Sequence, residues 1–445
     1  MKKILILCFF LLSFISSQAQ DNKTSFSLKQ AIDYALTNEG TVKNALIDEE
    51  ISHEKVKELI GLGTPQIEGS ADINNFLEIP TSFVPAEFFN GEPGTYAPVQ
   101  FGQKYSSTVG LTATQLLFDG SYVVGLQASR AYQDLSRKQT HQTKVETVAK
   151  VSKAYYGVLV MESRMTIINA NIDRVKKLAD DTKALYQNGF AEKIDASRIQ
   201  LTYNNLLVER EKVERFKILA VALLKFQMGY DPLQPLTLTD NLKDYPYEAQ
   251  NNLPDSADYK KLPQYDVIMA QNKLGELDLK RYKYTYLPSF VAFGSLSANA
   301  SRSEFDIFDT SKPWYPTSVI GLKLTVPIWD GLQKNSRISQ AKLNLMKIDN
   351  ASTIVKNGIQ LEYETAQVNY KNNLAALKTV QENRDLAAEI SSVSKIKYDN
   401  GVGSSLELVD AESALREADA NFFNTLYDTI VSKIDLDKAS GNIAY

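Results

Sequence analysis

A run of 69 residues without proline, from Gly120 to Asn188, restricts the fold of this chain more than any other feature. As a single α-helix it would extend about 100 Å, whereas about 30 Å already spans a small domain. Apolar residues recur within it at intervals of three and four, as in Ile168, Ile172 and Val175. This spacing is typical of a helix that packs along its length against other helices. We therefore predict a long, coiled-coil-like helix.

The same construction occurs a second time further along the chain. The segment PIWDG (Pro327–Gly331) matches LLFDG (Leu116–Gly120), and each opens a proline-free run that ends at an Asn-Gly turn. The aspartates of the two segments are 211 residues apart, and Gly229 and Gly441 are 212 apart. An offset that changes by one residue over such a length indicates an internal duplication.

The N-terminal segment has the pattern of a secretory signal peptide. Two lysines precede an apolar run, Ile4–Ile15, and small residues follow it, so we predict that residues 1–19 are removed by cleavage after Ala19. The apolar run has 12 residues. A membrane anchor is disfavoured because a spanning helix needs about 20 residues. The only cysteine, Cys8, lies inside this run, so the mature protein is expected to have no disulfide, thiolate metal site or cysteine nucleophile.

Composition and motifs exclude several classes of function. The chain has 49 Lys and Arg residues against 53 Asp and Glu residues, and this mildly acidic balance argues against a nucleic-acid partner. His53 and His141 do not form a His-x-x-x-His pair, and neither a Gly-x-Ser-x-Gly motif nor a phosphate-binding loop is present. We therefore expect neither an enzyme nor a cofactor.

Proline positions and apolar periodicity divide the mature chain into two repeats of one layout. In each repeat a helical segment is followed by a β-hairpin, a long helix and a shorter returning helix. The predicted first repeat, 20–230, has helices at 27–62, a hairpin at 66–117, a long helix at 120–188 and a returning helix at 190–229; an irregular equatorial linker, 231–256, leads to the second repeat, 257–445, with a helix at 258–285, a hairpin at 288–328, a long helix at 331–400 and a returning helix at 402–440.

Each hairpin contains a strand with one apolar face and one small or polar face. Tyr105–Leu117 and Ser318–Ile328 alternate in this way, which is the pattern of strands in a membrane barrel. A half-buried strand of a soluble sheet has the same periodicity. Four strands cannot close a barrel, and an open edge in lipid leaves backbone groups unpaired. Strands in a membrane would therefore require two, three or four chains to associate.

The chain as a whole resembles the TolC-type outer-membrane efflux proteins. The resemblance rests on the duplicated order of elements, on TPQI and LPSF at the strand entries, on LFDG and IWDG at the long-helix starts, and on the turns Tyr186–Gly189 and Tyr398–Gly401. It implies a mainly α fold with a transmembrane β-barrel portion. Long helical hairpins would form an α-barrel in the periplasm, and a homotrimer would form one twelve-stranded barrel in outer-membrane lipid of a Gram-negative bacterium.

The resemblance also implies partners and a function. A periplasmic adaptor (membrane fusion) protein and an inner-membrane pump of the RND or ABC type would dock at the far end of the helices. The chain would then be a passive exit duct of a tripartite efflux or type I secretion-like system, gated at its periplasmic tip. The alternative is a secreted helical scaffold or adhesin that does not enter a membrane.

Site residues follow from the same resemblance, position by position. Glu407 and Asp410 match acidic residues that narrow the tunnel, whereas Asp195 and Tyr398 match residues that hold the closed tip. A basic residue common in the family is replaced here by Gly403 and Ser404, so the closed-state contacts are expected to differ. The resemblance implies that the adaptor contacts the turn residues Asn188, Gly189, Phe190, Asn400, Gly401, Val402 and Gly403. From spacing alone, the helix dipole is the favoured explanation for acids near helix N-termini, and only the resemblance favours a pore role for Glu407 and Asp410. The alternative explanation for Asn-Gly is that it terminates helices well.

Overall fold

The computed structural model describes residues 24–242 and 256–443. The predicted signal peptide and half of the predicted linker, residues 243–255, lie outside these residues. The chain divides into two compact units, one made of Met1–Ile47, Gln139–Asp266 and Ile354–Tyr445, and the other of Asp48–Lys138 and Val267–Thr353. Each unit therefore takes segments from both predicted repeats.

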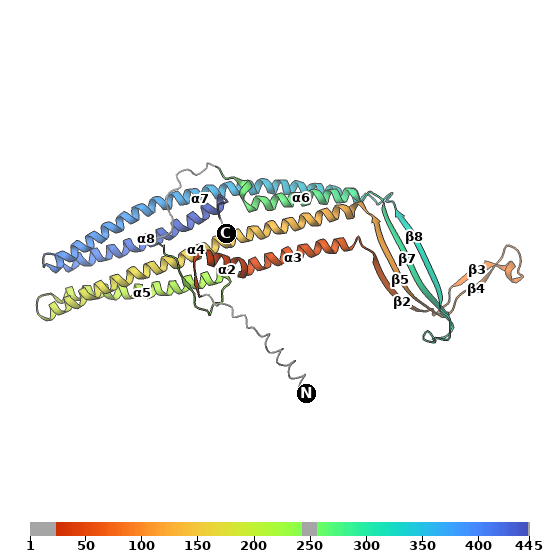
Figure 1. The fold of residues 1–445 in the computed structure, drawn as a ribbon, viewed down its shortest axis with the longest axis horizontal. Helices are drawn as coiled ribbons and strands as arrows, with labels where there is room; N and C mark the ends of the chain where they lie inside the picture. Colours follow the sequence, from red (N-terminus) through yellow and green to blue (C-terminus); the bar gives the residue numbers. More distant parts are fainter. Residues whose placement is uncertain (1–23, 243–255, 444–445) are drawn as a thin grey trace, which may run out of the picture. The chain divides into compact units, whose positions relative to one another are not determined.

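The first unit contains most of two long helical hairpins, whose long helices begin in the second unit and enter the first at Gln139 and Ile354. Helix α4 (Gly120–Gln187) returns as α5 (Lys193–Met228), and α7 (Gln333–Asp399) returns as α8 (Ser405–Ala439), as Figure 1 shows. The first hairpin is held by apolar side chains at helical spacing, which form one buried cluster: Ile168, Ile172 and Val175 of α4 with Leu206 and Val213 of α5. Within the described residues, none of the helices combines the length and the apolar character that crossing a membrane requires.

The sequence motifs before the long helices are helix caps. The Oδ1 atom of Asp119 accepts a hydrogen bond from the Tyr122 backbone N–H at 2.9 Å, and the Oδ2 atom of Asp330 accepts one from Lys334 at 3.0 Å. An aspartate at this position satisfies a backbone donor that the helix leaves unpaired. The second helix begins two residues later than predicted because the residues after the capping aspartate, including Leu332, have a positive φ.

The predicted helical segment 27–62 is two helices, α2 (Leu28–Asn38) and α3 (Gly40–Gly61). Ser27 caps the first helix in a reciprocal capping box with Gln30. Glu39 has an extended backbone that ends α2. Its carboxylate caps α3 by accepting hydrogen bonds from the backbone N–H groups of Thr41 and Val42 at 2.9 and 3.0 Å.

Aromatic residues form a core around Phe26, near the first described residue. Strand β1 (Ser25–Phe26) pairs in parallel with β6 (Thr237–Leu238). Phe26 makes edge-to-face contacts with Tyr34 and Tyr230, each at 5.6 Å between ring centroids. The hydroxyl of the buried Tyr155 donates to the Phe26 carbonyl at 3.1 Å. Burial, followed by its interaction with Asp240, raises the pKa of Tyr155, so this donor stays neutral at physiological pH.

Gly229 ends α5 in a left-handed conformation, and the backbone of Asn38 and Glu39 packs directly against it. Its φ is +65°, and a Cβ there would lie 2.6 Å from the Asn38 carbonyl oxygen. We expect Gly229→Ala to lower the free energy of unfolding by about 2 kcal/mol or more, because left-handed strain and a backbone clash add together. The matched control is Gly189→Ala, with a φ of +81° and nothing within 4 Å of the added Cβ. It is expected to cost about 1 kcal/mol. Thermal denaturation followed by circular dichroism compares the two, and equal losses would contradict the predicted clash.

The second unit contains most of α3 and of α6 (Pro263–Tyr284) together with a four-stranded antiparallel sheet. Its strands are β2 (Gln66–Asn75), β5 (Tyr105–Phe118), β7 (Ser289–Arg302) and β8 (Tyr315–Thr325), and they lie in that order (Figure 1). The predicted hairpins of the two repeats are thus the pairs β2–β5 and β7–β8. The pair β5–β7 joins them into one sheet.

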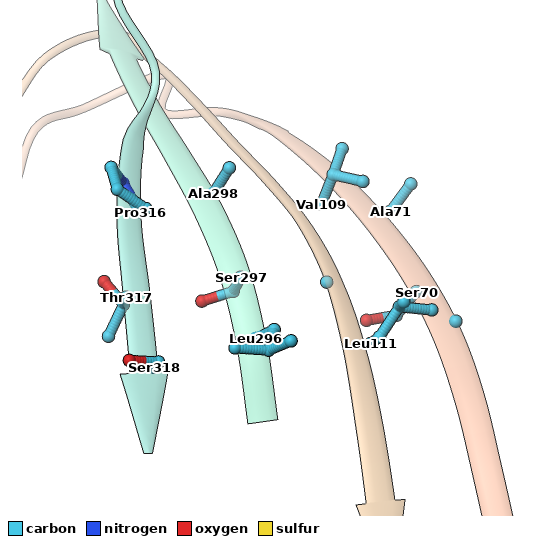
Figure 2. A pocket seen from close by; sticks show the side chains of 12 residues that line it. Ser70, Ala71, Val109, Leu111, Leu296, Ser297, Ala298, Pro316, Thr317 and Ser318 are labelled. Atoms are coloured by element: carbon cyan, nitrogen blue, oxygen red, sulfur yellow. The ribbon is translucent and has the colours of Figure 1, made fainter. Parts of the chain in front are cut away.

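The register of the sheet gives it one apolar and one polar face. Ala71 pairs with Val109, Val109 with Ala298, and Ala298 with Pro316. Figure 2 shows this row of side chains along a shallow hollow of the sheet. Residues in the next register row, which include Thr108, point to the opposite face, because side chains alternate along a strand. This agrees with the alternation predicted for β5.

The connection between β2 and β5 contains further secondary structure. It contains a separate two-stranded ribbon, β3 (Thr81–Pro85) with β4 (Tyr96–Gln100), and a 3₁₀ turn, η2 (Ala86–Phe89). Proline and glycine are frequent in this part of the sequence and are typical of an irregular loop. The two strands have only five residues each, which is too short to give a clear sequence pattern.

Candidate functional site

The turns that end the two helical hairpins have the same hydrogen-bonding pattern. At the first turn the Phe190 N–H donates to the Leu185 carbonyl at 2.9 Å, and the Gly189 N–H donates to Tyr186 at 3.0 Å. These bonds, with a φ of +81° at Gly189, form a Schellman motif. The Asn188 amide donates to the Ala184 carbonyl at 2.8 Å.

The second turn repeats this arrangement. The Val402 N–H donates to the Lys397 carbonyl, and the Gly401 N–H to Tyr398, both at 3.0 Å. The Asn400 amide donates to the carbonyl four residues before it at 2.7 Å. In both turns the residue after the glycine is apolar and faces solvent, Phe190 with 81% and Val402 with 78% exposure. The duplicated Asn-Gly signal therefore specifies both the turn and an exposed apolar residue. Gly403 lies beside Lys397 and Tyr398, where a Cβ would approach within 3.1 Å of the Tyr398 nitrogen.

Asp195 and Tyr398 join the two hairpins of one chain. The Ser405 hydroxyl, at the start of α8, donates to Asp195 at the start of α5. Arg198 lies 3.9 Å from the same carboxylate and donates to the Ser405 oxygen at 3.3 Å. The Tyr398 hydroxyl forms a hydrogen bond with Thr182 of α4 at 3.2 Å.

Glu407 and Asp410 lie on the exposed side of α8, one turn apart. The Glu407 carboxylate is 3.0 Å from Lys397 Nζ, and its backbone N–H donates to the capping Ser404 hydroxyl at 3.1 Å. Leu408 and Ala411 occupy the buried side of the same turns. The exposed stripe continues along the helix with polar residues, namely Glu417, Asn421, Asn424 and Asp428. Basic residues near the tip are thus supplied by Lys397 and Arg198, which no sequence motif indicates.

A buried polar network behind the tips also escaped sequence reasoning. Arg174 of α4 approaches both carboxylate oxygens of Glu412 at 2.8 Å, and the Ser391 hydroxyl of α7 donates to that carboxylate at 2.8 Å. Two turns along α8, Asp419 accepts a hydrogen bond from Arg384 at 2.7 Å. The available signal is that these two acids occupy buried positions of the apolar repeat of α8, where a charge needs a partner.

Comparison with known proteins assigns the chain to a family. The sequence matches the family described as outer membrane efflux protein over residues 96–215 and 283–442, which is more than half of its length. The chain belongs to this family. It is 22% identical to the outer membrane protein TolC of Escherichia coli (strain K12) over 465 residues, covering 100% of this chain and 87% of that protein. The TolC of Vibrio cholerae (serotype O1) is 20% identical over 339 residues, covering 76% and 77%.

Solved outer membrane channels have the same fold as this outer membrane efflux protein. The CmeC channel of Campylobacter jejuni superposes with a TM-score of 0.71 at 17% identity, covering 93% of this chain and 86% of that one. The open state of Neisseria gonorrhoeae MtrE gives 0.71 at 17% identity, covering 93% and 88%. The predicted fold class, mainly helical with a four-stranded portion, is confirmed.

Family membership also decides between the two functions considered from the sequence. The chain is a subunit of a trimeric outer-membrane efflux channel of a Gram-negative bacterium, and the secreted scaffold or adhesin is not favoured. The family is one of channels and not of enzymes. TolC-type channels form trimers.

Proposed function

We propose that this channel is gated at the tips of its helical hairpins and that an adaptor protein docks there, connecting it to an inner-membrane pump of the RND or ABC type. The observation that supports this proposal is the duplicated tip. Both hairpins end in the same turn and present an exposed apolar residue, Phe190 or Val402. Exposed apolar residues on a rigid turn suit a protein–protein contact.

The gate in this proposal consists of contacts between the two hairpins and of acids beside them. Opening would separate α8 from α5 at their first turns, which breaks the hydrogen bond from Ser405 to Asp195. It would also separate α7 from α4, where Tyr398 meets Thr182. Glu407 and Asp410 of three copies would bring six carboxylates around one axis, a site that attracts cations. Transport energy would come from the pump, because the chain has no nucleotide-binding motif.

Substitution at the two tips tests the adaptor contact. Phe190→Asp with Val402→Asp places a charge in each exposed apolar contact, so we expect host resistance to exported toxic compounds to fall by about tenfold or more. Crosslinking from position 190 or 402 to a periplasmic adaptor should disappear as well.

The matched control is Phe308→Asp. This phenylalanine is 82% exposed and belongs to the other unit, between β7 and β8. Its substitution is expected to leave both resistance and crosslinking unchanged. Full resistance in the double tip variant, with normal amounts of channel in the outer membrane, would exclude these residues from the docking surface.

A further inference from the structure

Charged side chains within the four-stranded sheet mark its two edges. Edge strand β2 has Glu68 and Asp72, and edge strand β8 has Lys323. Between them, β5 has no charged residue and β7 has only Arg302, its last residue. Arg302 is used inside its own chain, where it donates to the Pro313 carbonyl at 2.9 Å. Acids thus lie at one edge of the sheet and a base at the other.

The three edge charges share the polar face of the sheet. Glu68 pairs with Thr112, Thr112 with Ser295, and Ser295 with Val319. Lys323 lies four residues beyond Val319, and the second acid of β2 lies four residues beyond the first. Because side chains alternate along a strand, all three point to the same face. In an outer-membrane barrel this polar face lines the lumen.

Each of the three charges lacks a salt-bridge partner within the part of its own chain that the structure describes. Salt bridges elsewhere in the second unit join neighbours in sequence, such as Lys273 with Glu276, or residues of adjacent helices, such as Arg137 with Glu49. Glu68, Asp72 and Lys323 take part in none of these and are exposed. Their partner is therefore to be sought outside the chain.

A second copy of the chain supplies the complementary edge. β2 and β8 are the two strands with one unpaired side, and they run antiparallel to each other. Closing a ring of identical sheets places β2 of one copy against β8 of the next. We propose that Lys323 forms a salt bridge in the lumen with Glu68 and Asp72 of the neighbouring copy, and that this contact sets the register of the seam, the junction of β8 with the neighbour's β2. This proposal rests on the trimeric channel.

The alternation of the strands restricts the register of this seam. Lys323 has to lie opposite a β2 residue of the polar face, because a slip by one residue would turn Ile67 and Ile73 into the lumen. Opposite Ser70, the lysine has one acid diagonally on each side, within reach of a long side chain. A shift by two residues either way places it directly opposite one of the acids. Each of these registers forms the salt bridge.

Charge exchange across the seam tests the proposal. Lys323→Glu places three acids at each seam, so we expect the trimer to dissociate on a detergent gel at a temperature lower by roughly 5 °C or more. Adding Glu68→Lys and Asp72→Lys to this variant restores opposite charges, and most of the loss should be recovered. The matched control, Ser297→Glu, adds a charge to the same face of the inner strand β7, between Gly110 and Thr317, and should leave the trimer intact.

Cysteine pairs give a second readout should Lys323→Glu fail to assemble. The only native cysteine, Cys8, lies in the predicted signal peptide, so the mature chain is expected to add no cysteine of its own. Lys323→Cys is combined in turn with cysteine at positions 68, 70 and 72, and oxidation should link copies in one of these combinations. Thr317→Cys, about 20 Å along β8, is the control that should not link.

The outcomes separate the seam from the channel itself. A wild-type protein that is monomeric under all conditions would overturn the trimeric channel, and the seam with it. A stable wild-type trimer would instead overturn only the salt bridge in either of two cases: Lys323→Glu leaves its dissociation temperature unchanged or is not rescued, or cysteine at 317 links better than cysteine at 323.

Discussion

Replacing Glu412 with alanine is expected to lower the free energy of unfolding by about 3 kcal/mol. The Glu412 side chain is only 8% exposed, and it accepts hydrogen bonds from Arg174 and Ser391. Its removal leaves the Arg174 guanidinium without its counter-charge between helices of the two hairpins. Because Arg174 keeps some contact with solvent, the loss should lie at the lower end of what breaking a buried ion pair costs.

Thermal and urea denaturation of the detergent-solubilised protein measure this loss. The matched control is Glu407→Ala, which removes a carboxylate from the same helix and breaks its salt bridge with Lys397. That pair is about half exposed, so its loss should cost less than about 1 kcal/mol. A Glu412→Ala variant as stable as this control would show that the network does not hold the hairpins together.

Removing both acids at the tip is expected to weaken cation block of the channel by about tenfold or more. In the proposed gate, Glu407→Ala with Asp410→Ala deletes six carboxylates from the narrowest part of a trimer. Six like charges in a confined space bind a multivalent cation far more strongly than dispersed surface charges do. Single-channel current in planar bilayers, recorded over a series of divalent and trivalent cation concentrations, measures the change.

The control for the gate removes the same charge from another exposed helix. Glu382 and Glu389 are exposed on α7, and replacing both with alanine also deletes six carboxylates per trimer. This variant should be blocked at wild-type concentrations. Equal block in the tip variant and the wild-type channel would remove Glu407 and Asp410 from the pore.

Sequence reasoning succeeded where local chemistry decides the structure. A capping aspartate and an Asn-Gly turn each act within a few residues, so the ends of the long helices are recognisable in the sequence. The apolar repeat between these ends indicates the helix itself. Asp119 and Asp330 cap them, and Gly189 and Gly401 end them. The duplication helped further, because each weak signal occurs twice.

The features that escaped prediction depend on residues far apart in the chain. Arg174 and Glu412 are separated by 238 residues, and no local pattern connects them. Lys397 lies on α7, before the second turn, and Arg198 lies on α5 of the other hairpin, so a search for a base after Gly401 could not find them. That the edge charges of the sheet share one face follows only from the strand register, which the sequence alone does not give.

The most direct test of the account is the mass and the electrical activity of the purified protein. Native mass spectrometry of the detergent-solubilised protein should give three copies of the mature chain, and the same sample should form conducting pores in planar bilayers. A monomer that stays in solution without detergent and conducts no current would contradict the channel on which the gate, the docking tips and the seam all depend.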